Sequence, residues 1–106
     1  MRHGNIDVPM DKLEAVCKRW SITELSLFGS VLRDDFRPDS DVDVMVRFSK
    51  DSHISLLDIA RIQDDLGEVF GGRRVDLSER EAIEKSPNYV FRHYALRQAE
   101  PVYVAG

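Results

Sequence analysis

The sequence predicts an α+β fold, in which a small mixed β-sheet is packed with helices. Short apolar runs that suit strands alternate with longer segments whose apolar residues recur every three or four positions, as in helices. The strand-like runs at 42–48 and 74–77 are joined through a helical segment, which is the βαβ arrangement of parallel strands. With 106 residues, the chain (1–106) is expected to form a single domain with one core.

The first half of the chain is expected to hold a helix, a strand and a helical turn. Residues 1–8 read as an irregular lead-in, and Pro9 suits the first position of a helix over roughly 10–19. A strand over 24–28 follows, and it leads into a tight turn and a short helix. The apolar residues of the first helix are three or four apart: Leu13, Val16, Cys17 and Trp20.

The second half is expected to contain the remaining strands and two longer helices. Gly71-Gly72 is expected to end the first of these helices. Ser86 is expected to cap the second, with Pro87 at its first position. In chain order the expected elements are a strand over 42–48, a helix near 55–70, a strand over 74–77, a helical turn within 78–83, a helix over 87–98 and a short edge strand over 102–104.

The tight turn after the first strand has the composition of a phosphate site. Gly29 permits a sharp bend, and Ser30 can cap the helix that follows. The first N–H groups of a helix have no partner within it, so they point outward and suit a phosphate. Arg33 lies one turn further on, where its guanidinium either reaches a phosphate or forms a salt bridge with Asp34 or Asp35.

Three aspartates are candidates for a metal site. Asp41 and Asp43 begin a strand, and the two-residue period places both side chains on the same face. Asp76 would face this pair if its strand is a neighbour, although a strand-end acid can also cap the next helix. Carboxylate oxygens suit Mg²⁺, and three carboxylates can hold two ions for in-line phosphoryl transfer. Ser40 is either a turn former or a partner that orients Asp41.

The spacing of these residues resembles the signature of the DNA polymerase β-like nucleotidyltransferases, in which Gly-Ser is followed by ten residues and then Asp-x-Asp. Here ten residues separate Gly29-Ser30 from Asp41-Val42-Asp43, and Asp76 is the later carboxylate. Over about 13–104 the chain is similar to the minimal, MntA-type group of that superfamily. It departs from the group at Asp34, where a glycine often follows the arginine.

The resemblance implies a polymerase β-like nucleotidyltransferase fold and a Mg²⁺-dependent reaction, expected to use two ions and ATP as substrate. An acceptor oxygen attacks the α-phosphorus of the triphosphate, and pyrophosphate leaves. The later carboxylate helps to remove the acceptor proton. The expected catalytic and metal-binding residues are Asp41, Asp43 and Asp76, and the expected nucleotide-binding residues are Gly29, Ser30, Arg33 and Ser40.

Composition narrows the class of function. The formal net charge of −4 argues against tight duplex binding, so no DNA partner is expected. No apolar run approaches the length of a membrane span and no signal-peptide core is visible, which favours a cytoplasmic protein without a membrane partner. Cys17, the only cysteine, is read as a buried small hydrophobe. Phe91 and Tyr94 have helical spacing. Core packing is expected for them in preference to stacking on a nucleotide base.

The acceptor is expected to come from another chain, because 106 residues accommodate the catalytic pieces but no acceptor-binding domain. The resemblance to the MntA group implies that this partner is a HEPN-domain RNase toxin. The chain would then be its antitoxin, transferring AMP from ATP to a tyrosine of the toxin. Two alternatives stay open: a non-catalytic antitoxin that acts by binding and occlusion, and a nucleotidyltransferase that acts on a small molecule or RNA.

Overall fold

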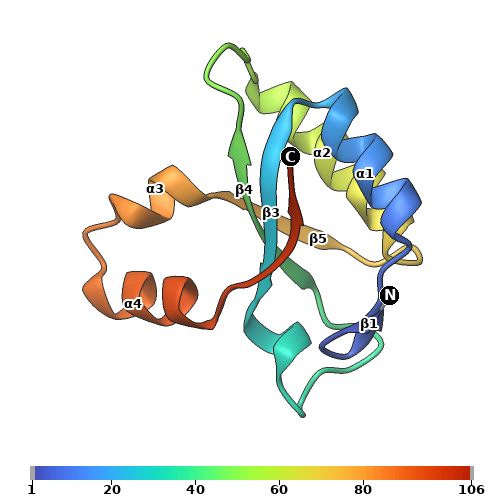
Figure 1. Ribbon diagram of the computed structural model, residues 1–106. Helices are drawn as coiled ribbons and strands as arrows, with labels where there is room; N and C mark the ends of the chain where they lie inside the picture. Colours follow the sequence, from blue (N-terminus) through green and yellow to red (C-terminus); the bar gives the residue numbers. More distant parts are fainter. Residues whose placement is uncertain (1, 106) are drawn as a thin grey trace.

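A four-stranded mixed sheet forms the centre of the computed structural model, which describes residues 2–105 (Figure 1). A two-stranded hairpin and four α-helices surround it. In chain order the elements are β1 (Arg2–His3), β2 (Ile6–Asp7), α1 (Met10–Arg19), β3 (Ile22–Phe28), the 3-10 helix η1 (Gly29–Leu32), β4 (Val42–Phe48), α2 (Leu56–Val69), β5 (Val75–Glu79), α3 (Arg80–Glu84), α4 (Tyr89–Gln98) and β6 (Glu100–Val104).

The strand order of the sheet is β5-β4-β3-β6. β4 runs antiparallel to β3 and parallel to β5, and α2 joins the two parallel strands. This arrangement confirms the mixed sheet and the βαβ unit predicted from the sequence. β6 pairs antiparallel with β3 at the edge of the sheet and is the edge strand predicted near the end of the chain. Two predicted boundaries, helix 10–19 and strand 42–48, agree with α1 and β4.

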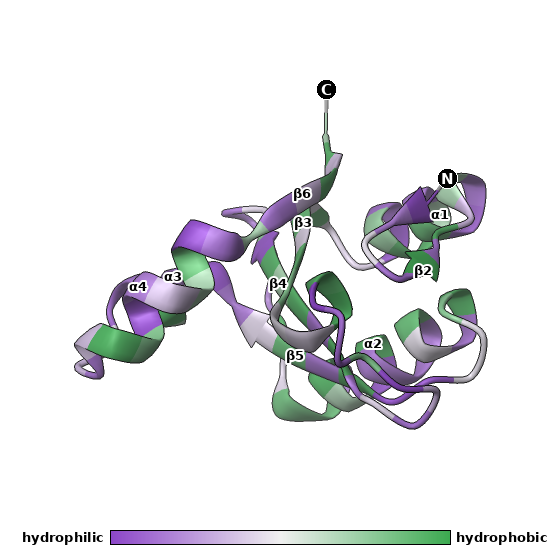
Figure 2. Cartoon of the chain, turned by 90° about the horizontal axis from the view of Figure 1, so that it is seen from below, coloured by the Kyte–Doolittle hydropathy of each residue, from purple (hydrophilic) through white to green (hydrophobic). Residues whose placement is uncertain are grey.

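Helices cover both faces of the sheet. α1 and α2 pack together on one face, and α3 and α4 lie against the other (Figure 1). Side chains alternate along β4, which Figure 2 shows as a largely hydrophobic strand. Val42, Val44 and Val46 are therefore buried in the core under α1 and α2, whereas Met45 packs on the α3–α4 side. By the same alternation Asp43 lies on the α3–α4 face.

The last helix begins two residues later than the sequence suggested. α4 starts at Tyr89, because the Asn88 side chain caps it by accepting a hydrogen bond from the Phe91 N–H at 3.0 Å. The predicted cap, Ser86, instead accepts from the Asn88 N–H at 3.2 Å and forms a turn before the helix.

No helix within residues 2–105 is long and apolar enough to cross a membrane.

The expectation of an irregular lead-in is wrong for residues 2–8, while residue 1 lies outside the described residues. β1 and β2 form an antiparallel hairpin whose end is buried in the core through Ile6 and Val8. At its tip Asn5 contacts the segment after the Gly-Ser turn. The Asn5 Nδ2 donates to the carbonyls of Val31 at 2.9 Å and Arg33 at 2.5 Å, and the Asn5 backbone N–H donates to Val31 at 3.0 Å. The hairpin therefore holds η1 in place.

Candidate active site

A pocket of about 180 Å³ opens on the α3–α4 face, where β3 ends and β4 and β5 begin. Three parts of the fold meet there: the turn after β3, the first residues of two parallel strands, and one side of α4. Five of the seven predicted site residues line this pocket, and Asp41 and Ser40 are the two that do not. The lining includes Gly29, Ser30 and Arg33 from the turn, Asp43, Asp76 and Ser78 from the sheet, and Phe91 and Tyr94 from α4.

Asp43 and Asp76 are direct neighbours in the sheet. They occupy opposite positions in the parallel register of β4 and β5, so their side chains share one face. This relationship is the one that the sequence predicted from the two-residue period and the βαβ connection. It brings two carboxylates from residues 33 positions apart (76 minus 43) into one pocket.

Gly29 brings the turn against Asp43. Its φ of +77° is a conformation that favours glycine, and a Cβ at this position would collide with the Asp43 carboxylate. The close approach lets the Ser30 backbone N–H donate a hydrogen bond to that carboxylate. The turn predicted to bind phosphate thus lies directly beside one of the candidate metal ligands, and its Ser30 N–H is already paired with that carboxylate.

The environment of Asp43 disfavours its charged form. Burial raises the pKa of the Asp43 carboxyl above its usual value, and the negative charges of Asp76 and Asp41 raise it further. The Ser30 N–H and the Arg33 guanidinium act in the opposite direction, but they do not cancel the rise. The negative charges of the two neighbouring carboxylates therefore favour a proton or a cation at Asp43.

Asp41 contributes to the charge at Asp43 but does not line the pocket, so the predicted gathering of all three carboxylates in one pocket is not seen. Its side chain is exposed, and one carboxylate oxygen lies 3.7 Å from Nε of Arg74. Within residues 2–105, no three His, Cys, Asp or Glu side chains are gathered closely enough to hold a metal ion as they stand. The donors nevertheless fit Mg²⁺ chemically, because all three are carboxylates and their charges influence one another at Asp43.

Arg33 forms the salt bridge that was one of its two predicted roles, and its contact with a phosphate stays a prediction. Its Nε lies 3.2 Å from a carboxylate oxygen of Asp35, which is the salt bridge, and the guanidinium also lines the pocket. There it donates a hydrogen bond to the hydroxyl of Tyr94, which links the turn to α4. Ser40 forms a turn, since its hydroxyl accepts from the Arg37 N–H at 3.0 Å. A role for Ser40 at the nucleotide stays a prediction.

Sequence reasoning missed the α4 wall of the pocket and Ser78. The expectation of core packing is wrong for Phe91, which is 39% exposed, and Tyr94 is only partly buried. Apolar residues at helical spacing suit either a core or a pocket, so the pattern alone does not separate the two. Ser78 had a usable signal, because it lies two residues after Asp76 on the same strand face.

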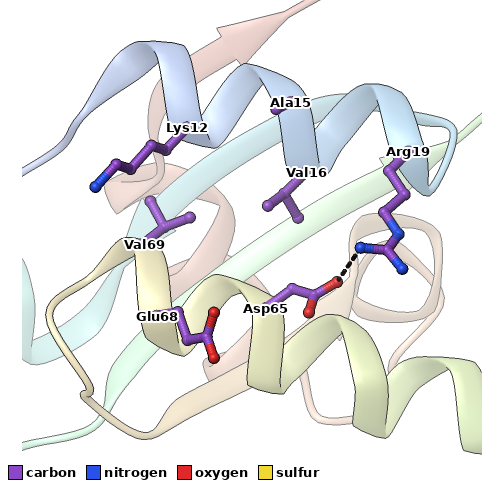
Figure 3. Close-up of a pocket in the computed structure, with 7 residues that line it drawn as sticks. All are labelled: Lys12, Ala15, Val16, Arg19, Asp65, Glu68 and Val69. Atoms are coloured by element: carbon purple, nitrogen blue, oxygen red, sulfur yellow. Dashed lines mark ion pairs between the residues drawn. The ribbon is translucent and has the colours of Figure 1, made fainter.

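A larger hollow lies between α1 and α2, on the opposite face of the sheet (Figure 3). Its volume is about 560 Å³, and Ala15, Val16 and Val69 give it an apolar floor. One rim carries the ion pair of Arg19 with Asp65, at 4.0 Å. None of the seven residues that line it belongs to the predicted turn or carboxylate set. Size alone therefore does not locate the site, and the chemistry favours the smaller pocket.

Comparison with known proteins gives a family and two relatives. The nucleotidyltransferase domain family matches residues 10–99. A Methanocaldococcus jannaschii protein assigned as protein adenylyltransferase MJ0435 is 33% identical over 73 residues, which cover 69% of this chain and 75% of that protein. The protein adenylyltransferase MntA of Thermococcus cleftensis is 34% identical over 67 residues, covering 63% of this chain and 65% of that protein.

Solved structures are similar along most of the chain. A minimal nucleotidyltransferase superposes with a TM-score of 0.64 at 34% identity, over 88% of this chain and 91% of that one. A toxin–antitoxin crystal structure with AMP-PNP gives a TM-score of 0.67 at 16% identity, over 92% of this chain and 75% of that one. At that identity the second likeness concerns the fold alone. Both agree with the fold predicted from the sequence.

Proposed function

This chain belongs to the nucleotidyltransferase domain family and is a nucleotidyltransferase, and we propose that it is an antitoxin that transfers AMP from ATP to a tyrosine of a HEPN-domain RNase toxin. The observation that carries the proposal is the meeting of Gly29-Ser30 with Asp43 and Asp76 in one pocket. Protein acceptors are favoured because both sequence relatives are named protein adenylyltransferases. A toxin partner is favoured by the MntA name and by the toxin–antitoxin neighbour.

In the proposed reaction the tyrosine oxygen attacks the α-phosphorus of ATP. A new bond forms between these two atoms, and the bond from the α-phosphorus to the oxygen that bridges to the β-phosphorus breaks. Pyrophosphate leaves with that oxygen, and AMP stays on the tyrosine. The phenolic proton is lost as the bond forms, and we assign its removal to the carboxylate of Asp76, which lines the pocket.

The predicted turn and carboxylate residues have proposed tasks in this reaction. The Ser30 end of the turn holds the β- and γ-phosphates, and Arg33 adds a cationic fork beside them. Asp41, Asp43 and Asp76 would hold Mg²⁺. A bound Mg²⁺ supplies positive charge to the attacking and leaving oxygens. Asp41 must leave Arg74 to take part, which an exposed side chain does at small cost.

The direct test is to incubate the chain with ATP, Mg²⁺ and a HEPN-domain toxin with which it forms a complex, and then to record intact-protein mass spectra. We expect the partner to gain the mass of one or more adenylyl groups, and peptide mapping to place them on a tyrosine. An unmodified partner in a verified folded complex would contradict the proposal. Modification of a small molecule or RNA by the isolated chain would favour the alternative acceptors.

A double substitution separates catalysis from occlusion. Asp41→Asn with Asp43→Asn should abolish adenylyl transfer and protection of cells from the toxin. Asp34→Asn with Asp39→Asn is the matched control, because it removes the same charge from exposed residues that do not line the pocket. If the Asp41→Asn, Asp43→Asn chain still protects cells, binding suffices and the antitoxin does not need its reaction.

A further inference from the structure

An aromatic side chain from α4 lines the pocket that contains the carboxylates. Phe91 lies in the first turn of α4 and lines the pocket together with Asp43 and Asp76. Its ring is 39% exposed, and within residues 2–105 it belongs to neither core cluster. The helix is anchored instead by Ala95, which is fully buried against Phe28, Met45 and Ile83. Packing of the fold therefore does not explain an aromatic residue at this position.

The position of Phe91 is fixed although its ring is open. The Asn88 side chain accepts a hydrogen bond from the Phe91 N–H at 3.0 Å, which sets the start of the helix. One helical turn later, Tyr94 binds Arg33 and ties α4 to the turn. The backbone that carries the ring is thus held beside the pocket before any ligand arrives, and pre-organisation of this kind lowers the entropic cost of binding.

The two preceding residues differ from Phe91. Tyr89 and Val90 are 66% and 75% exposed, and neither lines the pocket. The exposed pair suits contact with a protein, whereas Phe91 lines the pocket that is proposed to take the substrate.

The proposed phosphate positions do not involve Phe91, so its ring is available to the nucleoside part of ATP. The β- and γ-phosphates occupy the Ser30 turn, and the α-phosphorus lies over Asp43 and Asp76. The nucleoside must then contact the rest of the lining, to which Phe91 contributes an aromatic side chain. We propose that the Phe91 ring forms one side of the nucleobase site, with the adenine of ATP stacked on it. This inference rests on the proposed function.

Stacking gives a specific expectation for affinity. Base–aromatic stacking strengthens binding, so loss of the ring should weaken nucleotide binding roughly 5- to 150-fold. It should not weaken binding of a ligand that lacks a base. Because every base has a flat aromatic face, the ring contributes affinity for the nucleoside and little preference for adenine over guanine.

The test is calorimetric titration of the full chain in Mg²⁺ with AMP-PNP and, separately, with inorganic tripolyphosphate. We expect Phe91→Ala to weaken AMP-PNP binding by that factor and to leave tripolyphosphate binding unchanged. Phe91→Leu keeps an apolar side chain without a flat face and should weaken AMP-PNP as well. Phe91→Trp should bind it as tightly as the parent or more tightly. Val90→Ala is the control, and it should bind both ligands like the parent.

Each other outcome overturns the inference. Unchanged AMP-PNP affinity in Phe91→Ala means that the base lies elsewhere, and equal weakening of both ligands means that the ring acts on the phosphate site. Full affinity in Phe91→Leu means that no stacking occurs, and this variant decides the question if Phe91→Ala does not fold. If the parent binds no AMP-PNP, the proposed function fails together with the inference. If the parent adenylylates its partner while Phe91→Ala binds AMP-PNP normally, only the inference fails.

Discussion

Gly29 and Asp43 are packed so closely that no other residue fits at position 29 without moving the carboxylate. Gly29 also has a φ of +77°, which disfavours every residue with a Cβ. We therefore expect Gly29→Ala to lower the free energy of unfolding by about 2–5 kcal/mol, the sum of backbone strain and overpacking. Adenylyl transfer should be lost even where the protein remains folded, because Asp43 and the Ser30 N–H are displaced. Urea unfolding and the mass-spectrometric assay measure the two effects.

Gly71 provides the matched control for this prediction. It has the same φ of +77°, but a Cβ there would meet nothing within 4 Å. Gly71→Ala should therefore show only the backbone cost, about 1–2 kcal/mol, and retain activity. Equal destabilisation by the two substitutions would mean that the contact with Asp43 has no energetic consequence.

A second prediction concerns the N-terminal hairpin. Asn5→Ala removes the two side-chain hydrogen bonds to the carbonyls of Val31 and Arg33, while the Asn5 backbone bond can remain. We expect a loss of about 1–2 kcal/mol in unfolding free energy. The apparent affinity for AMP-PNP should also fall, since η1 becomes less well held. Calorimetry of the folded variant measures the second effect.

Arg2→Ala controls for the hairpin itself. Arg2 makes one long, exposed hydrogen bond to the Asn5 carbonyl, at 3.4 Å, so its loss should change unfolding by no more than about 0.5 kcal/mol. If Asn5→Ala is as mild as Arg2→Ala, the hairpin does not position the turn.

A third prediction separates function from stability at Asp43. The like charges of Asp76 and Asp41 oppose ionisation of Asp43, as does its burial. Asp43→Asn keeps an oxygen for the Ser30 N–H and removes the repulsion. We expect the variant to be at least as stable as the parent in metal-free buffer and to have no transferase activity. Metal-free thermal unfolding and the transferase assay test this. A clear loss of stability would show that Asp43 is favourably paired in the fold.

The sequence revealed the centre of the site better than its surroundings, for a physical reason. The period of a strand is a local pattern, and it predicted that Asp76 would face Asp43 if their strands were neighbours, as β4 and β5 are. The hydrogen bonds of Asn5 join residues 26 and 28 positions apart, and no local pattern signals them. The exposed ring of Phe91 depends on where α4 rests on the sheet, which helical spacing does not determine.

Cys17 permits a fourth prediction, on reactivity. Its side chain is fully buried on α1, and burial raises the pKa of the thiol to about 12, with a smaller contribution from the charge of Glu14. The thiolate is the reactive form, so Cys17 should react with Ellman's reagent only as fast as the protein unfolds. Because the pKa of Cys17 is raised from 9.0 in the folded protein, the protonated thiol contributes to the free energy of unfolding. This contribution is complete below about pH 9 and is lost as the pH rises towards 12. Rapid labelling of the folded protein would contradict the burial.

The last prediction concerns Mg²⁺ and ATP together. ATP alone brings phosphates beside three carboxylates that already repel one another, and Mg²⁺ alone lacks the phosphate oxygens that complete its ligands. The two should therefore bind cooperatively. A complex present at ten times its dissociation constant contributes about 1.4 kcal/mol, which raises Tm by roughly 6–11 °C in a domain of this size. We expect that rise with Mg²⁺ and AMP-PNP together and a smaller one with either alone. Asp43→Asn with Asp76→Asn should abolish the excess, and a melting curve indifferent to both ligands would exclude a magnesium–nucleotide site in this pocket.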